Sequence, residues 1–491
     1  MSTMQIVDEA LGKIATGNRQ YAYNRTTWRY MLESYLGGED YRRGMHLTRY
    51  QLETDKEYGA RLRSTPLENH CKAVINVYNS FLFKDTPERE FGTMPSDMIE
   101  IKGFLEDADM EGRSLNAFMK DASTWASVFG HCWVLVVKPN IGAITRADEM
   151  SAGVRPYLVM LNPLSVLDWH WERDQSGYYD LKKLKYIEDI NGSIQTIKEW
   201  TPEAITTWVI DYDKKTLLTE SIEVNELGSI PAVTVYCTRS TVRGVGVSDI
   251  ADIADLQKSI YNMLSEVEQT VRMDSHPSLV KTPETNAGTG AGSIISIPEN
   301  LDPGLKPYLL EYGGASIASI YQAIESARNA IEKMANIGAV RATSSGVMSG
   351  IAMQTEFQLL NAKIAEKAQN LDLAEEQIWE LFAQYQGYEW DGCIEYPTDY
   401  SIQDEQQEYV NLQTAKSAAT GPEALAVVDQ MIIDLLTDDT ILEGKIFVAL
   451  IGQSTSDLAE EATPVTPPTD VVIESAAAVN LDNPSLNRTF A

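Results

Sequence analysis

Two neighbouring stretches with helical spacing, between residues 315 and 386, constrain the fold more than any other feature of this sequence. From Ala315 to Val340, apolar residues recur at intervals of three and four, which places them in one stripe on an amphipathic helix. The second stretch, from about Ser349 to Tyr385, keeps this spacing with one break, at Lys367. Such a helix spans roughly 55 Å, whereas globular helices average about 11–12 residues. The spacing is equally compatible with rods that pack beside copies of themselves and with a helical hairpin inside a large globular protein.

A slim loop joins the two predicted helices. It consists of Ala342-Thr-Ser-Ser-Gly-Val-Met348 and contains no bulky polar side chain. From the sequence pattern alone, it is only a connection between the two helices.

The charge of the chain restricts the partners that it can bind. Its 491 residues, enough for several lobes, carry a net charge of −31, and residues 388–491 contribute 19 acidic against three basic residues, a net of −16. Tight binding to nucleic-acid phosphates requires clustered Lys and Arg, so this balance argues against it. The surplus indicates either a solvated acidic surface or a surface that stays near DNA without adhering to it. The four cysteines are scattered and are expected to be reduced thiols. The sequence contains no run of 18 uncharged apolar residues, so no membrane-spanning helix is expected.

Coarse patterns divide the chain into helical and β-rich parts, an α+β organisation. Residues 1–92 are predicted to be mainly helical, followed by one helix over about 98–119. The Arg- and Tyr-rich segment 41–50 is expected to pair with acidic neighbours rather than with nucleic acid. Runs rich in β-branched residues then predict a β-rich lobe with meander connections, and they cover 132–138, 156–161, 166–172, 181–187, 194–200, 204–210 and 230–238.

The remaining segments complete the expected order of elements. Residues 243–248 predict a hinge, with Ser248 as the N-cap of a helix of about 25 residues and Asp249 in its first turn. A compact β insertion over 276–314 precedes the two long helices, and 393–396 is expected to be a strand that returns to the β-rich lobe. Helices at about 403–419, 422–436 and 440–451 follow. The Pro-containing tail 459–491 is expected to be extended.

No catalytic motif emerges from the sequence, and neither a metal site nor a cofactor site is expected. The Gly-rich stretch Asn286–Gly292 lacks the ending of a P-loop and precedes no helix, so a hairpin tip is the favoured interpretation. Asp249, Asp252 and Asp255 recur at intervals of three on one helix, where a solvated face is more common than a metal site. The five histidines are scattered, and none has a second histidine at metal-ligand spacing.

This order of segments resembles that of the portal proteins of tailed bacteriophages. The similarity extends over about residues 20–400 and is carried by three stretches: Tyr58–Phe83, Arg155–Glu172 with an Asp-Trp pair near its end, and Ser349–Lys367. No single motif is diagnostic, and the order is the specific part. One departure is Met353, where the family often has a Lys after Ser-Gly-x-Ala.

The resemblance implies a portal fold with the following parts. Residues 1–245 would form an α/β wing, completed by a return strand in 387–402. Two stem helices would occupy 246–275 and 315–341, separated by a small β-containing clip at 276–314. The remaining parts would be a tunnel loop at 342–348, a tunnel helix at 349–386, a helical crown at 403–458 and the extended tail at 459–491.

The resemblance also implies sites, partners and a location. The tunnel loop residues Ser344, Ser345, Gly346, Val347 and Met348 would face the DNA channel. Possible basic contacts are Arg341, Lys363 and Lys367, although pairing with a carboxylate of a neighbouring subunit is an alternative for each. The clip would bind partners through Thr285, Asn286, Thr289, Pro298, Glu299 and Asn300.

The implied function is that of a structural protein without catalysis. A ring, commonly of twelve subunits, would sit at one vertex of the capsid of the virion and pass double-stranded DNA during packaging and ejection. Its partners would be the terminase large subunit, adaptor or connector proteins and the major capsid protein, with no membrane, and the protein would be made in the host bacterial cytoplasm. The alternatives are a metal-dependent nuclease, motivated by the three aspartates, and another connector ring of the virion.

Overall fold

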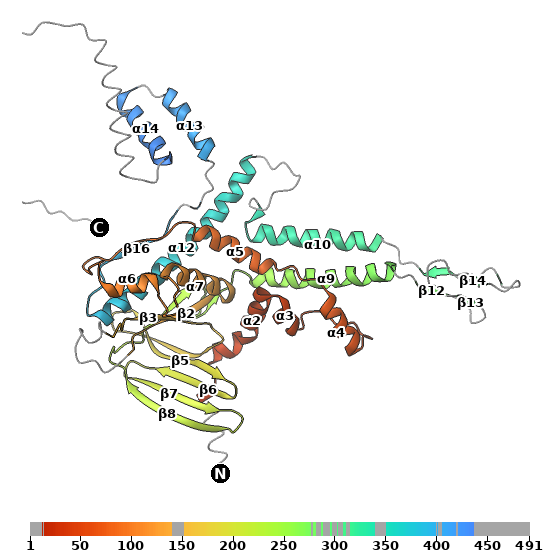
Figure 1. Ribbon diagram of the computed structural model, residues 1–491, viewed down its shortest axis with the longest axis horizontal. Helices are drawn as coiled ribbons and strands as arrows, with labels where there is room; N and C mark the ends of the chain where they lie inside the picture. Colours follow the sequence, from red (N-terminus) through yellow and green to blue (C-terminus); the bar gives the residue numbers. More distant parts are fainter. Residues whose placement is uncertain are drawn as a thin grey trace, which may run out of the picture. The chain divides into compact units, whose positions relative to one another are not determined.

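The computed structural model describes residues 12, 14–139, 152–275, 278–280, 286–287, 295–296, 302, 308–310, 315–338, 350–398, 400, 405–418 and 421–436. The chain divides into two units, Met1–Ser401 and Ile402–Ala491. Helices and strands both contribute to the first unit, as an α+β protein requires (Figure 1).

The N-terminal part of the first unit is helical, as predicted. Its elements are α2 (Arg19–Leu36), α3 (Gly38–Arg43), α4 (Asp55–Ser64), α5 (His70–Leu82), the short strand β1 (Glu88–Glu90), α6 (Ile99–Glu106) and α7 (Leu115–Phe129). Side-chain caps fix several starts: Asn18 accepts a hydrogen bond from the amide of Tyr21, and Thr54 forms a capping box with Glu57. The single helix expected over 98–119 is wrong, because residues 107–114 separate α6 from α7.

The β-rich lobe consists of two separate sheets. A three-stranded antiparallel sheet has the order β3–β2–β9 and a five-stranded meander runs from β4 to β8. The strands of the first are β2 (His131–Val137), β3 (Tyr157–Leu161) and β9 (Ala232–Tyr236). Those of the second are β4 (Val166–Arg173), β5 (Tyr179–Asn191), β6 (Ile194–Trp200), β7 (Ala204–Asp211) and β8 (Thr216–Val224). The sequence runs predict every one of these strands except β8, whose side chains are nearly all exposed.

A packed turn stands where a hinge is predicted. Gly130 ends α7 with φ +91°, and the backbones of Gly130 and Gly246 touch so closely that a Cβ atom on either would overlap the other. The two-residue strands β10 (Thr238–Arg239) and β11 (Gly246–Val247) pair across this turn. The following helix, α9 (Ala251–Ser275), begins later than expected. Because α9 begins at Ala251, Ser248 and Asp249 both precede it. The Ser248 hydroxyl accepts a hydrogen bond from the amide of Ile250.

The two long predicted helices are present. Helix α9 and α10 (Ala315–Met334) lie side by side, and α12 (Gly350–Gln386) extends for 37 residues (Figure 1). Between α9 and α10, β12 (Ser278–Val280) pairs with β15 (Tyr308–Leu310), and β13 (Asn286–Ala287) pairs with β14 (Ile295–Ser296). Helix α10 ends at Met334, before the expected Val340, and Asn336 two residues later has φ +54°.

The segment after α12 corrects one further expectation. Strand β16 (Cys393–Glu395) pairs with β1, between α5 and α6, and not with the β-rich lobe. The described residues of the second unit form α13 (Glu405–Ala418) and α14 (Pro422–Leu436), which Lys416 and Asp429 link through an ion pair. The helix expected at 440–451 and the tail at 459–491 lie outside the described residues.

A continuous apolar core of the first unit joins α12 to the N-terminal helices and to both sheets. Trp133 and Trp379 are the largest of its fully buried side chains. Each large apolar side chain buried in this way stabilises the fold by about 1.5–3 kcal/mol. The core therefore holds the C-terminal half of α12 against the rest of the unit.

Candidate functional site

A buried ion pair fixes α12 to the start of α9. The Lys367 ammonium on α12 contacts the Asp249 carboxylate, and both side chains are at most 6% exposed. The same ammonium lies 2.9 Å from the Ser127 hydroxyl on α7 and 3.1 Å from the Cys237 sulfur after β9. One lysine thus joins α12 to α7, β9 and the segment that leads into α9.

The electrostatics of this anchor follow from the removal of charges from water. Burial by itself raises the pKa of a carboxyl group, but Lys367 and Lys363 more than offset it and hold the pKa of Asp249 at about 2. Burial likewise lowers the pKa of Lys367, yet Asp249 reverses the effect and the pKa is raised. Burial raises the pKa of the Cys237 thiol to about 11. All three groups therefore keep one protonation state at neutral pH, with the pair fully charged and the thiol neutral.

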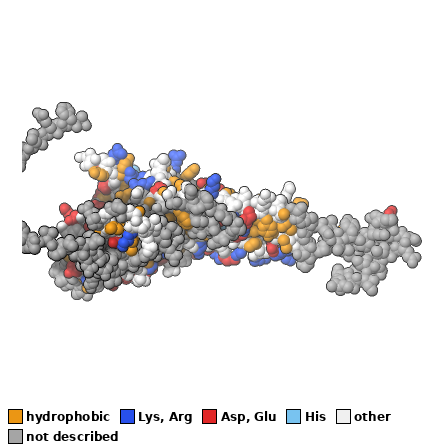
Figure 2. All heavy atoms as spheres, turned by 90° about the horizontal axis from the view of Figure 1, so that it is seen from above, with side chains coloured by type: hydrophobic (Ala, Val, Ile, Leu, Met, Phe, Trp, Pro, Cys, Tyr) orange, Lys and Arg blue, Asp and Glu red, His pale blue; other side chains and the backbone are white. Residues whose placement is uncertain are grey.

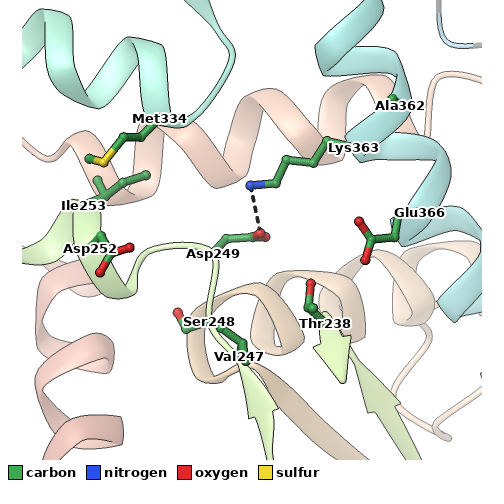
Figure 3. Close-up of a pocket in the computed structure, with 10 residues that line it drawn as sticks. All are labelled: Thr238, Val247, Ser248, Asp249, Asp252, Ile253, Met334, Ala362, Lys363 and Glu366. Carbon is green, nitrogen blue, oxygen red and sulfur yellow. Dashed lines mark ion pairs between the residues drawn. The ribbon is translucent and has the colours of Figure 1, made fainter. Parts of the chain in front are cut away.

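Lys363, one turn earlier on α12, completes the anchor. Its ammonium lies 3.3 Å from the second Asp249 oxygen and 4.9 Å from the centre of the Tyr78 ring on α5. Figure 3 shows Lys363 reaching from α12 towards Asp249 across an open cleft. The cleft has a volume of about 630 Å³ and carries the carboxylates of Asp252 and Glu366 on its wall. The Tyr78 hydroxyl also donates to the Ala335 carbonyl at 2.7 Å, which ties the end of α10 to the same place.

A second buried network anchors α12 two turns further on. The Glu375 carboxylate is fully buried and forms an ion pair with Arg89 of β1. It also accepts a hydrogen bond from the Tyr396 hydroxyl at 2.7 Å, just after β16. Arg89 in turn donates to the Asn116 side chain at 2.7 Å, on α7. The strand pair β1–β16 is therefore locked onto α12 through charged hydrogen bonds, which are stronger than neutral ones.

Asp372 lies between the two anchors on α12, where its surroundings disfavour the charged carboxylate. Its carboxylate accepts a hydrogen bond from the Tyr396 amide at 2.9 Å. Burial raises the pKa of Asp372 to about 6, with a further contribution from the acidic neighbours Glu376, Glu375 and Glu395. Asp372 is therefore the group in this region whose charge changes just below neutral pH.

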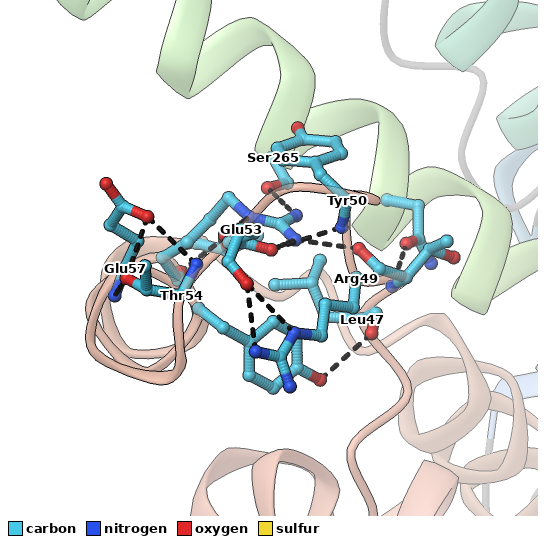
Figure 4. Close-up of polar contacts among 12 residues, drawn as sticks. Leu47, Arg49, Tyr50, Glu53, Thr54, Glu57 and Ser265 are labelled. Carbon is cyan, nitrogen blue, oxygen red and sulfur yellow. Dashed lines mark hydrogen bonds and ion pairs between the residues drawn. The ribbon is translucent and has the colours of Figure 1, made fainter.

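Arg61, on α4, links the Arg- and Tyr-rich segment 41–50 to α9. The buried Arg61 guanidinium pairs with Glu53 at 2.7 Å, donates to the Thr48 carbonyl and donates to the Ser265 hydroxyl of α9 at 3.0 Å. Figure 4 shows the polar contacts of this region, with Ser265 and Tyr50 beside Glu53. The arginines of segment 41–50 pair with acidic neighbours in the chain, which confirms the expectation: Arg42 with Glu39, Arg43 with Asp40, and Arg49 with Asp55.

Most of the residues predicted to contact DNA or partner proteins lie outside the described part of the chain. The tunnel-loop residues Ser344, Ser345, Gly346, Val347 and Met348, together with Arg341, lie outside the described residues, as do Thr285, Thr289, Pro298, Glu299 and Asn300. Asn286 opens β13 and pairs with Ser296. Lys363 is 28% exposed and already paired.

Lys367 requires a correction. It is 5% exposed, and its charge is neutralised by a carboxylate of the same chain, not by DNA or by a neighbouring subunit. The break that Lys367 makes in the apolar stripe was the available signal, because a charge on a buried helix face requires a buried partner. The sequence does not show that the partner is Asp249.

The three aspartates of the metal-site hypothesis do not act together. Asp249 is engaged by two lysines, and Asp255 accepts a hydrogen bond from the Tyr30 hydroxyl at 3.1 Å. In the part of the chain that the structure describes, no group of three or more His, Cys, Asp or Glu side chains is arranged to hold a metal ion. None of the described helices is long and apolar enough to span a membrane.

Comparison with protein families decides what this arrangement belongs to. The family model for phage portal proteins of the SPP1 Gp6-like type matches residues 18–437. The chain belongs to this portal family. The family is a structural one, and its match extends from the cap of α2 to the end of α14, so the anchors of α12 are features of a portal protein. The alternative of a nuclease is not favoured.

Solved structures with a similar chain trace come from gene transfer agent (GTA) particles. The neck of an empty GTA particle, computed with C6 symmetry, contains a chain with a TM-score of 0.45 and 9% identity, covering 77% of the portal protein and 94% of that chain. The virion of the native gene transfer agent particle gives a TM-score of 0.44 and 10% identity, covering 78% and 95%. No curated protein sequence matches the chain.

Proposed function

We propose that copies of this portal protein assemble into a ring of twelve subunits, the number that the family resemblance implies, and that this ring conducts double-stranded DNA at one vertex of a virion capsid. The observation that carries this proposal is the portal family match over residues 18–437. The different compositions of the exposed faces of α10 and α9 in the single subunit also support the proposed ring.

The exposed face of α10 is suited to contact with another protein subunit. Ten positions between Ile317 and Met334 are exposed, and only Glu325 and Lys333 among them carry a charge. Tyr321 is 47% and Met334 44% exposed. Figure 2 shows apolar side chains gathered on the part of the helix pair next to the β12–β15 segment. A helix face with so little charge is typical of a protein interface.

The neighbouring helix α9 has the opposite character. Seven positions from Asp252 to Arg272 are exposed, and five of them are charged: Asp252, Asp255, Lys258, Glu266 and Arg272. Such a face is suited to water or to the polar rim of an interface. In a ring, the sparsely charged face of α10 would therefore meet the next subunit, while α9 would keep more contact with solvent.

The parts of the fold take roles in this proposal. Residues 1–245, with 387–402, form the wing, and α9 and α10 lie within the stem segments 246–275 and 315–341. The segment 276–314 is the clip, 342–348 the tunnel loop and 349–386 the tunnel helix. The second unit contributes the crown within 403–458, followed by the tail at 459–491. The two anchors described above then connect the tunnel helix to the stem and the wing.

The charge of the chain suits a conduit. A DNA duplex carries one negative charge per about 1.7 Å, so a channel through which it slides must not bind it strongly. A chain with a net charge of −31 meets that condition. Ser344, Ser345 and Gly346 would touch the duplex through weak contacts that do not depend on sequence. Arg341 and Lys363 remain candidates for basic contacts, whereas Lys367 does not.

The proposed partners follow from the same placement. The terminase large subunit and adaptor or connector proteins would bind at the clip, through Thr285, Asn286, Thr289, Pro298, Glu299 and Asn300. The wing would face the major capsid protein. The assembled ring would be part of the virion after synthesis in the bacterial cytoplasm.

Electron microscopy of the purified full chain tests the proposal. Rings with a central hole are the expected result, and a monomer at high concentration in every salt condition would overturn it. Ala323→Glu, on the exposed face of α10, should prevent ring formation because it buries a charge at the interface. The matched control Ser259→Glu, on the exposed face of α9, should still give rings. If both variants assemble, α10 is not the interface.

A further inference from the structure

A cleft between the meander sheet and α12 contains arginines that no carboxylate of the described chain neutralises. We call it the arginine cleft and define it by six of its lining residues, Trp169, Trp171, Tyr179, Tyr236, Arg239 and Arg243. Its volume is about 940 Å³, large enough for several side chains of a ligand.

The guanidinium groups of this cleft stack on aromatic rings. Arg243 lies 3.9 Å from the centre of the Tyr179 ring and 5.5 Å from that of Trp171. The Arg239 guanidinium lies 5.3 Å from the centre of the Tyr236 ring, and that of Arg173, which is not a lining residue, lies 4.7 Å from the centre of the Tyr179 ring. A stacked guanidinium keeps its N–H edge available, and that edge matches the two oxygens of a carboxylate.

The absence of partners is unusual within this protein. Of the sixteen arginines that the structure describes, ten form an ion pair with a carboxylate. Arg173, Arg239 and Arg243 are three of the six without one. In a chain with 71 acidic residues, a cluster of three arginines that lack a carboxylate marks a place where an external anion would be favoured.

The loop that carries Arg239 and Arg243 is held in place before any ligand arrives. The Trp169 indole donates to the Arg243 carbonyl at 3.2 Å, and the Gly244 amide donates to the Tyr236 hydroxyl at 2.8 Å. The Ser240 hydroxyl donates to the Val245 carbonyl at 2.7 Å. Gly244, at φ +79°, lies against the Trp169 indole with no room for a Cβ atom. Such preorganisation lowers the entropic penalty of binding.

Two lining groups add unused donors. The Trp171 indole N–H and the Thr234 hydroxyl are buried, and neither has a hydrogen-bond partner in the part of the chain that is described. Buried donors without a partner are rare in folded proteins and destabilise them. Both donors favour a ligand that supplies acceptor oxygens.

We propose that the arginine cleft binds an acidic segment of a partner protein, with Arg239 and Arg243 holding its carboxylates and the aromatic rings packing against its aliphatic carbons. A peptide fits better than DNA because Asp180 and Glu380 also line the cleft. These two carboxylates would repel a continuous row of phosphates, but they leave room for separate carboxylates placed between them. The proposal does not depend on ring formation.

The test measures binding of fluorescein-labelled octaglutamate to the full-length protein by fluorescence anisotropy, with octaglutamine as the uncharged reference peptide. We expect binding of octaglutamate only, weakened at least tenfold in R239Q/R243Q, because each guanidinium contributes a charged hydrogen bond. Arg63→Gln removes an exposed arginine of α4 that has no ion pair, and it should leave the affinity within twofold. Tyr179→Leu, which removes the ring beneath Arg243, should also weaken binding.

Three outcomes would overturn the proposal. The first is no octaglutamate binding at low salt, and the second is equal binding by the wild type and R239Q/R243Q. The third is tighter binding of a short DNA duplex with the same dependence on both arginines, which would make the cleft a phosphate site. Circular dichroism of each variant separates loss of binding from loss of fold.

Discussion

Lys367, on α12, and Asp249, two residues before α9, form an ion pair in which both side chains are almost completely buried. The pair connects α12, the longest of the described helices, to α9, which leads towards segment 276–314. Because each charge is buried, neither residue can be removed alone without leaving the other uncompensated.

Lys367→Met should therefore destabilise the protein strongly, by about 3–5 kcal/mol, because it leaves the Asp249 charge buried with only Lys363 nearby. Lys363→Met is the matched control. It removes a lysine that is 28% exposed, and it should reduce stability by less than about 1 kcal/mol. Urea unfolding at neutral pH measures both. The double variant D249L/K367M should recover most of the loss, and equal effects of the two single lysine variants would contradict a structural role for the pair.

The contact between Gly130 and Gly246 offers a sharper test of backbone packing. Gly130→Ala should destabilise the fold by several kcal/mol, because the new Cβ atom would lie 2.4 Å from the Gly246 carbonyl carbon. Gly177 has nearly the same φ, +93° against +91°, but open space around it. Gly177→Ala should therefore show only the backbone strain of about 1 kcal/mol. The difference between the two melting temperatures measures the clash alone, and no difference would mean that the turn adjusts freely.

Much of the fold could be predicted from the sequence because its elements have strong local signals. The apolar stripes of α10 and α12 and the β-branched runs of the two sheets fall within a few residues of their predicted positions. Strand β8 escaped because its side chains are exposed, so no apolar alternation marks it. The break between α6 and α7 and the pairing of β16 with β1 depend on tertiary contacts that periodicity does not contain.

The anchors of α12 were less predictable than the helix itself. Lys367 was visible as an irregularity in the apolar stripe, but its partner lies 118 residues away in the chain. Asp249 was instead grouped with Asp252 and Asp255, because spacing along one segment is all that the sequence displays. The arginine cleft is a stronger case, since its lining comes from α2, both sheets, the β10–β11 turn and α12.

Asp372 predicts a pH dependence of stability. Its pKa is about 6 in the fold against an ordinary value of 3.8, so the fold favours the protonated form. The stability that this group contributes is fully present below pH 3.8 and is lost as the pH rises through about 6. Asp372→Asn keeps an acceptor for the Tyr396 amide and removes the charge. It should be more stable than the wild type by about 1 kcal/mol at about pH 8, after allowance for solvent screening, and should lose that advantage near pH 4.

Arg61 predicts a local effect rather than a global one. Arg61→Lys cannot contact Glu53, Thr48 and Ser265 together, because an ammonium lacks the planar fork of the guanidinium. Segment 45–64 should therefore exchange its amide hydrogens faster, while α12 keeps its protection. Hydrogen exchange followed by mass spectrometry measures both regions in one experiment. Arg43→Lys, in an exposed ion pair, serves as the control and should change neither region.

The tunnel loop gives the prediction that bears most directly on DNA. Replacing Ser344, Ser345 and Gly346 with bulky residues should leave ring assembly intact, because the proposed subunit interface lies on α10. The same change should impair DNA packaging or retention, because side chains that fill the channel hinder a sliding duplex. Electron microscopy checks assembly, and the DNA content of purified particles checks packaging. An equally bulky triple substitution at the exposed positions Leu217, Leu218 and Thr219 of β8 should affect neither measurement. Normal packaging with the altered loop would show that residues 342–348 do not line the path of the DNA, even if the ring itself were confirmed.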